Sequence, residues 1–430
     1  MSSKFNKELQ TLVKDKIISP ELSEKIEQYY SKKEIDKPNK LFTIFGVFGS
    51  LLIGSGIILM LAYNWEGFTR FTKTVLAFVP LLLGQVLAGY SILKQKSRAW
   101  RETSGTFLFF SVGVSISLVS QVYNIMGDLG DFLQIWIILC LPLIYLIRSH
   151  ALAILLLIFS TAYALEVGVW NYRSTETPWL YIVFLLAIIP HYLWLLKKNI
   201  SNNIIAVFNW VLPLSISCAL SAFIRGGEYF GLAYITLFAL LYIIGKQEVF
   251  KELRTLKKGF LIIGSLGAVI SLMIFTFRWV WEEFSRDIVT NSEGFYTASV
   301  LLIMALSGLI YTIKKRGIHS INLFQVTFLI FWIIFFVPIN ITIPLILTNI
   351  LVFALGISAI KIGTDKFNFG ILNYGMLIIS ILIVCRFFDT GMSFVIKGIL
   401  FITVGIGFFL TNYIMLKRQQ KLKQLKNSKR

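Results

Sequence analysis

The sequence predicts an all-α polytopic membrane protein with about fourteen transmembrane helices. The 430 residues are 56% hydrophobic and only 15% charged, and their mean hydropathy is +0.75. A soluble domain is usually about 45–50% apolar and about a quarter charged, so this chain has too few charges to cover a water-soluble globule. Apolar runs of membrane-spanning length recur along it, separated by short polar tracts that are alternately basic and acidic.

Residues 1–40 are expected to form a cytoplasmic hairpin of two short amphipathic helices. Apolar side chains recur at helical spacing within residues 5–33. Ser19 is a candidate N-cap for the second helix, with Pro20 at its first position. A hairpin of this size does not bury enough apolar surface to be stable alone. We therefore expect it to dock on the membrane face, on a loop or on a cytoplasmic protein partner. The alternative is a partly ordered anchor helix.

The apolar runs are long enough to cross a hydrocarbon core as helices. We expect a first bundle of six spans (41–196), a two-helix insert with its basic loop (197–258), a second bundle of six spans (259–415) and a basic tail (416–430). The fourteen expected spans are 41–63, 71–93, 103–125, 132–147, 151–169, 178–196, 203–224, 229–245, 259–281, 295–313, 322–338, 341–360, 368–388 and 392–415.

Loop charges set the expected orientation in the bilayer. Lys and Arg concentrate in alternate loops, such as 94–101 and 246–258, whereas acidic residues occupy the loops between them. Because cytoplasmic loops carry the cations, both termini are expected in the cytoplasm. The basic tail is expected to bind anionic lipid headgroups. The formal charge of +19 does not predict nucleic-acid binding, because no basic domain stands apart from the spans.

Two similar hexapeptides suggest an internal repeat. WEGFTR (65–70) closes the first span and WEEFSR (281–286) closes the ninth. The same offset relates spans one to six to spans nine to fourteen, as in transporters built from two parallel halves. The alternative is convergence, since Trp, Glu and Arg are common at membrane interfaces. Trp65 and Trp281 are expected at the interface, and Glu282 is expected to pair with Arg278 at i, i+4.

A polar segment, SQVYNIMGDLGD (120–131), interrupts the apolar pattern after the third span. Gln121, Asn124 and Asp128 recur at i, i+3 and i+7, which predicts one polar stripe on a helix. Gly127 permits a tight turn, and Tyr123 and Asp131 are expected at the interface. The segment is either an interhelical hydrogen-bonding strip or the mouth of a solute or cation site. The candidate site residues are Gln121, Asn124, Asp128, Glu166, Asn64 and Glu66.

Several other polar residues lie inside apolar spans. Glu166 is near the end of span five, where a carboxylate either marks a pathway or reaches the interface. Pro190 weakens span six, and His191 beside it is expected to be a hydrogen-bonded packing residue rather than a ligand. Asn209 and Asn349 are expected to link helices. Gly264 and Ala268 form a small-residue face that favours close helix packing.

Three sequence landmarks together resemble a known family. They are the ISPE turn at 18–21, Asn64-Trp65 at the end of the first span, and Q-x-Y-x-x-x-G-D from Gln121 to Asp128. The combination resembles bacterial membrane proteins catalogued as domain of unknown function 2157, over roughly residues 5–160. The resemblance implies a polytopic protein of the bacterial inner membrane with no assigned activity.

The sequence contains no HExxH metal motif and no phosphate-binding Gly-rich loop with its Lys. We therefore expect no enzyme activity, metal or cofactor. The leading hypothesis is transport or binding of a small solute or lipid. The alternative is a membrane scaffold or sensor that uses the N-terminal hairpin to bind a cytoplasmic partner. A glycan or lipid transferase is disfavoured, because the longest external loop, roughly 282–294, is small.

Overall fold

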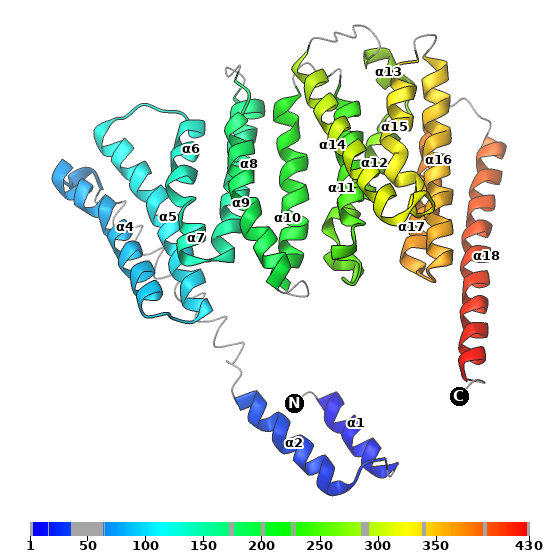
Figure 1. Cartoon of the computed structure of the whole chain (residues 1–430), viewed down its shortest axis with the longest axis horizontal. Helices are drawn as coiled ribbons and strands as arrows, with labels where there is room; N and C mark the ends of the chain where they lie inside the picture. Colours follow the sequence, from blue (N-terminus) through cyan, green and yellow to red (C-terminus); the bar gives the residue numbers. More distant parts are fainter. Residues whose placement is uncertain are drawn as a thin grey trace. The chain divides into compact units, whose positions relative to one another are not determined.

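The computed structural model describes residues 3–15, 17–35, 63, 65–171, 176–198, 203–224, 227, 229–284, 292–337, 341–389 and 394–427. Every regular element in these ranges is helical (Figure 1). Nine of the described helices are long and apolar enough to cross a membrane, and three shorter ones are also apolar. The all-α class is thereby confirmed. The total of fourteen spans and their orientation stay predictions.

The chain divides into two compact units, Met1–Leu76 and Ala77–Arg430. The smaller unit begins with α1 (Ser3–Lys14) and α2 (Pro20–Ile35), which lie where the sequence predicted two helices. Ser19 Oγ accepts a hydrogen bond from the Leu22 N–H at 3.3 Å, so Ser19 is the N-cap of α2. The first predicted span, residues 41–63, lies outside the described residues except for Tyr63.

The predicted spans from the second to the eighth each coincide with helical structure. These helices are α4 (Arg70–Leu93), α5 (Arg98–Tyr123), α6 (Leu129–Cys140) with α7 (Leu143–Ile147), α8 (His150–Leu165) with the π-helical turn η2 (Glu166–Trp170), α9 (Trp179–Lys198), α10 (Asn203–Leu220) with the 3-10 turn η3 (Ser221–Phe223), and α11 (Phe230–Gly245).

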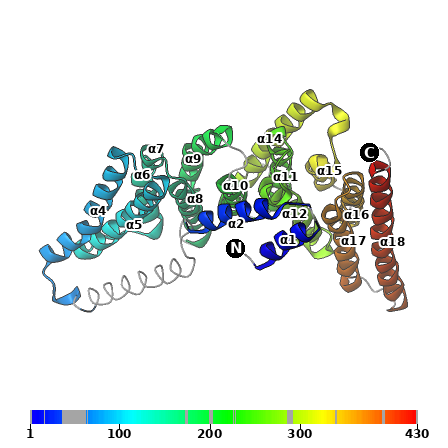
Figure 2. The ribbon, with the colours of Figure 1, turned by 90° about the horizontal axis from the view of Figure 1, so that it is seen from below.

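The later predicted spans coincide with helices as well. They are α12 (Gly259–Ile274) with α13 (Arg278–Phe284), α14 (Glu293–Arg316), α15 (Leu323–Phe335), α16 (Thr342–Asp365), α17 (Phe369–Asp389) and α18 (Phe394–Asn427). Consecutive helices pack side by side in this part of the chain. Both views show α17 beside α16 and α18 (Figure 2).

Two spans that the sequence predicted as continuous helices are interrupted. The span 132–147 breaks between α6 and α7 at Pro142, which has no N–H to donate to the preceding turn. The span 259–281 breaks after Ile274, and α13 starts at Arg278. Trp281 is buried, and its Nε1 donates to the Phe275 carbonyl at 2.8 Å. This bond satisfies a carbonyl at the break, so Trp281 has a packing role there, and its interfacial position stays a prediction.

Small residues let the helices approach closely. A Cβ added at Gly264 would lie 2.5 Å from the Tyr242 backbone nitrogen of α11, a distance that no real Cβ adopts. The predicted packing role of Gly264 is therefore confirmed. Most side chains of α11 are buried, so α11 is the central helix around which α12, α14 and α15 pack. Without a hydrophobic drive between helices in lipid, such close packing is a main source of association.

Candidate functional site

A groove of about 1380 Å³ opens between α4, α5 and α6. Its walls are mainly apolar, and polar residues gather where α5 ends and α6 begins. Gln121, Asn124 and Asp128, three of the predicted site residues, line this polar end together with Asp131. The apolar wall includes Phe78 and Leu81 of α4, Leu108, Val112 and Ile116 of α5, and Phe132, Ile135 and Leu139 of α6.

The predicted stripe on one helix is wrong in its local geometry. The helix α5 ends at Tyr123, and Asn124 follows in a left-handed conformation with φ +50°. Asn adopts this conformation more readily than other non-glycine residues, because its short side chain can hydrogen-bond locally. The three side chains therefore meet through a turn between two helices, and not along one helix face.

Asp128 has a defined structural role in this turn. It is the N-cap of α6, and its Oδ1 accepts the Asp131 N–H at 2.8 Å. A carboxylate at this position also interacts favourably with the N-terminal end of the helix dipole. Asp128 and Asp131 both line the polar end of the groove. Tyr123, the last residue of α5, and Gly127 in the turn are exposed, and their interfacial position stays a prediction.

The other predicted site residues are Glu166, Glu66 and Asn64. Glu166 is half-buried in η2 and is not among the residues that line the groove. Glu66 is exposed in the 3-10 turn η1 (Trp65–Gly67), where Trp65 is half-buried, and both belong to the smaller unit. Asn64 lies outside the described residues.

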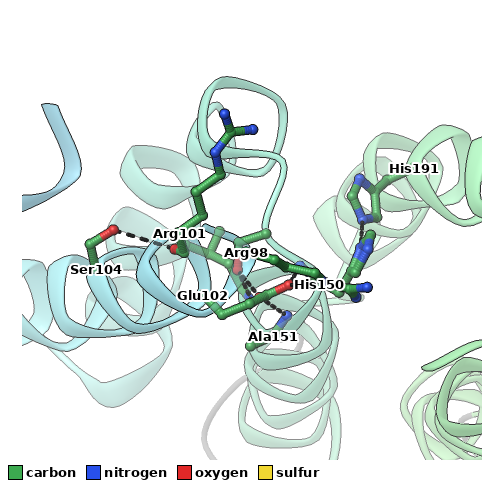
Figure 3. Close-up of polar contacts among 9 residues, drawn as sticks. Arg98, Arg101, Glu102, Ser104, His150, Ala151 and His191 are labelled. Atoms are coloured by element: carbon green, nitrogen blue, oxygen red, sulfur yellow. Dashed lines mark hydrogen bonds and ion pairs between the residues drawn. The ribbon is translucent and has the colours of Figure 1, made fainter. Parts of the chain in front are cut away.

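A partly buried polar network that the sequence did not predict joins α5 to α8 (Figure 3). One carboxylate oxygen of Glu102 accepts the Ser149 hydroxyl at 2.5 Å and the Ala151 N–H at 2.9 Å. The other accepts the His150 N–H at 3.1 Å. Arg98, one turn earlier on α5, lies 3.5 Å from that second oxygen. Glu102 thus satisfies the free N–H groups at the start of α8.

The network continues to α9 through two histidines. His150 Nδ1 and His191 Nε2 are 2.9 Å apart, and both rings are buried. One nitrogen must donate and the other accept, which requires at least one neutral ring. His191 is therefore a hydrogen-bonded packing residue, as the sequence predicted. The α9 helix runs through Pro190, and the Tyr145 hydroxyl donates to the Ala187 carbonyl in the turn that the proline weakens.

The polar atoms of this network bond mainly to main-chain groups and to one another. Within the described ranges, no group of three or more His, Cys, Asp and Glu side chains is arranged to hold a metal ion. The Glu102 oxygens are occupied by main-chain and hydroxyl donors. The sequence signals only part of this network. Ser149 before an apolar run indicates a helix N-cap, but its partner Glu102 is 47 residues away and cannot be inferred from local spacing.

One segment of the chain is similar to a known family of proteins. Residues 10–153 match the model of a family described as a predicted membrane protein, domain of unknown function 2157. The resemblance inferred from the sequence landmarks is thus confirmed for this segment, which includes the groove between α4, α5 and α6. No curated protein and no solved structure matches the chain. The family and the nine apolar helices together identify a membrane protein of unknown function.

Proposed function

We propose that this protein binds an amphipathic, lipid-like molecule in the groove between α4, α5 and α6. The observation that carries the proposal is the distribution of its lining: an apolar wall with polar groups gathered at one end. A volume of about 1380 Å³ exceeds the range of roughly 300–1,000 Å³ typical of small-molecule pockets. Acyl chains would lie along Leu108, Ile116 and Ile135, with the headgroup at the α5–α6 turn.

The polar end favours a headgroup that carries a positive charge. Asp128 and Asp131 supply carboxylates, and Gln121 and Asn124 supply amide donors and acceptors. An amine-bearing headgroup would complement these carboxylates, whereas a purely anionic headgroup would be repelled. We propose binding or movement of such a molecule rather than catalysis, in keeping with the lack of a catalytic motif in the sequence.

The number of spans and the orientation of the chain in the membrane are also part of the proposal. We propose fourteen spans with both termini in the cytoplasm of the bacterial inner membrane. The correspondence between predicted spans and observed helices supports it. The proposed parallel repeat rests on helix spacing alone, because the described parts of its two hexapeptides begin in different conformations. Trp65 begins a 3-10 turn, whereas Trp281 lies inside α13.

The proposal is tested with a substitution that fills the groove. The quantity measured is the amount of lipid that the purified full-length protein retains. Ile135 lines the groove and is exposed, so Ile135→Trp should obstruct an acyl chain without burying the new ring in the core. We expect roughly tenfold weaker retention, or about 1.4 kcal/mol, in native mass spectrometry after delipidation. The matched control is Ile303→Trp, an exposed site on α14 outside the groove lining.

A second variant tests the headgroup assignment. Asp131→Asn should leave total lipid retention nearly unchanged and reduce the preference for phosphatidylethanolamine over phosphatidylglycerol. Unchanged retention in Ile135→Trp would contradict the groove proposal. A photo-cross-linker at position 135 that reacted only with residues 41–62 of the same chain would also contradict it, since the groove would then be filled by the protein itself.

A further inference from the structure

Four cations come together at the ends of helices in the larger unit, far along the chain from the groove. Lys246 caps the C-terminus of α11, and Lys258 precedes α12. Arg316 is the last residue of α14, and Lys366 follows α16. We call these four residues the basic cluster. Lys246, Lys258 and Arg316 are partly buried, whereas Lys366 is exposed.

The partly buried lysines of the basic cluster are held mainly by neutral oxygens. Lys246 Nζ donates to the Ser320 carbonyl at 2.7 Å and to Gln325 Oε1 at 2.6 Å. Lys258 Nζ donates to the Lys251 carbonyl at 2.8 Å. These contacts orient the ammonium groups, but they do not neutralise them.

Acidic side chains compensate only part of this charge. Glu248 lies 3.7 Å from Arg316 Nε, and it also pairs with Lys315 at 3.1 Å. In the turns that hold the cluster, the described acidic residues are Glu248, Glu252 and Asp365, and all three are exposed. The same turns carry further cations at Lys251, Arg254 and Lys257. Positive charge therefore predominates at this end of the bundle.

Burial and the neighbouring like charges lower the pKa values of two lysines in the cluster. Burial, with Lys366 and Arg316 nearby, lowers the pKa of Lys246 to about 8. Burial and Lys366 also lower the pKa of Lys258. Cations at helix C-termini are stabilised by the helix dipole, and the positive-inside tendency favours them in cytoplasmic loops. Neither effect accounts for placing like charges together where water is partly excluded.

Two buried donors next to Lys246 lack an acceptor. Gln325 is fully buried, and its Nε2 has no hydrogen-bond partner among the described residues. Arg316 Nη2 is likewise buried without a partner there, although Nη1 of the same side chain donates to the Lys246 carbonyl at 2.8 Å. Buried donors without acceptors are costly, and they are uncommon unless water or a ligand completes them.

We infer that the basic cluster is a binding site for a phosphate-type oxyanion, supplied by the headgroup of an anionic lipid at this face of the membrane. Lys258 and Lys366 would contact the phosphate from the solvent side, and Lys246 would contact it from the protein side. Basic pockets between transmembrane helices bind anionic headgroups by this chemistry. The site is independent of the proposed groove, whose polar end is acidic.

The experiment titrates delipidated full-length protein with phosphatidylglycerol or phosphatidylcholine and measures binding by native mass spectrometry. Lys258→Gln and Lys366→Gln each remove one cation from the solvent side of the cluster. Each should weaken phosphatidylglycerol binding about fivefold, the effect of about 1 kcal/mol per cation near a membrane surface. Phosphatidylcholine binding should not change. The matched control is Lys94→Gln, an exposed lysine after α4 that removes the same charge elsewhere.

A competition arm identifies the source of the oxyanion. Displacement of phosphatidylglycerol by inorganic phosphate would show that the site recognises the phosphate itself. Resistance to inorganic phosphate would show that the lipid is the occupant. Equal phosphatidylglycerol affinity in the wild type and in both cluster variants would overturn the inference. An equal loss in Lys94→Gln would also overturn it, because binding would then depend only on net charge.

Discussion

Two asparagine side chains in the apolar helices form hydrogen bonds with partners on other elements. Asn209 is fully buried on α10, where its Oδ1 accepts the Tyr192 hydroxyl at 2.6 Å and its Nδ2 donates to the Lys257 carbonyl at 2.8 Å. Asn349 Nδ2 donates to the Leu345 carbonyl of its own helix at 2.8 Å and, at 3.4 Å, to the Thr276 carbonyl. The predicted linking roles of both residues are confirmed. Each such bond is worth on the order of 1 kcal/mol in a membrane protein.

The shifted pKa of Lys246 predicts how the stability of the folded protein depends on pH. Its pKa is lowered from the usual 10.5 to about 8 by burial, Lys366 and Arg316. Between these two values the unfolded chain binds the proton that the folded protein releases, so this group makes stability rise with pH. Below about pH 8 its unfavourable contribution is constant, because both states are protonated. The gain on raising the pH is therefore expected in the wild type and not in Lys246→Gln.

The measurement is the thermal unfolding midpoint of both proteins in detergent from about pH 7 to about pH 10. The wild-type midpoint should rise by a few degrees relative to that of the variant across this range. Comparing the two proteins cancels the titration of groups that they share. Parallel pH profiles would show that the Lys246 pKa is not lowered in the folded protein.

At the scale of elements, hydrogen bonds to the backbone groups at helix ends determine where several helices begin and stop. Glu102 completes the start of α8 from another helix, and Asp128 caps α6 from within its own turn. Breaks such as the one after Ile274 are stabilised by side chains that take up the freed backbone groups. The hairpin of α1 and α2 leaves Leu12, Ile17 and Leu22 exposed. Its docking on a partner or on the membrane stays a prediction.

The close contact between α11 and α12 predicts that a larger residue at position 264 lowers the stability of the protein. Gly264→Ala would place a methyl group 2.5 Å from the Tyr242 nitrogen and 2.7 Å from the Phe238 carbonyl oxygen. Backbone atoms cannot yield as a flexible side chain can, so we expect a loss of about 1–3 kcal/mol in unfolding free energy. The measurement is the denaturant or thermal midpoint of the purified protein.

Gly89→Ala is the control for this variant. It lies in α4 with no atom within 4 Å of the added Cβ, so the exchange should be neutral or slightly stabilising. If both variants unfolded at the same midpoint, close packing of α11 on α12 would not be a determinant of stability.

At the scale of the whole molecule, charge is separated between the two ends of the larger unit. The C-terminal ends of α9, α11 and α16 lie on one side, where Lys198, Lys246 and Lys366 are found (Figure 1). The turn after α5, with Asp128 and Asp131, lies on the opposite side. This separation supports the proposed orientation, with the basic ends in the cytoplasm.

The orientation predicts that both termini are cytoplasmic. A single cysteine near residue 3 or near residue 427, in a protein whose Cys140, Cys218 and Cys385 are replaced by serine, should resist an impermeant maleimide in intact spheroplasts. Both should react after permeabilisation. A cysteine at position 126, in the exposed α5–α6 turn, should react in both conditions and serves as the positive control. Termini on opposite sides of the membrane would require an odd number of spans.

The hydropathy pattern by itself determined the helical class, the approximate position of each described helix and the small-residue packing at Gly264. These features follow from local composition, since a helix in lipid must satisfy its own backbone and face apolar surroundings. The spacing of Gln121, Asn124 and Asp128 predicted that they lie near one another on one continuous helix. They do line one groove, but α5 ends before Asn124, so they meet through a turn.

Only the tertiary structure decided which distant residues meet. Glu102 reaches Ser149, His150 reaches His191, and Lys246 reaches Gln325 across 79 residues of sequence. Spacing along a helix cannot encode such pairs, because they depend on how separate helices pack and on where each one stops. The groove and the basic cluster arise in the same way, from helix ends that packing brings together.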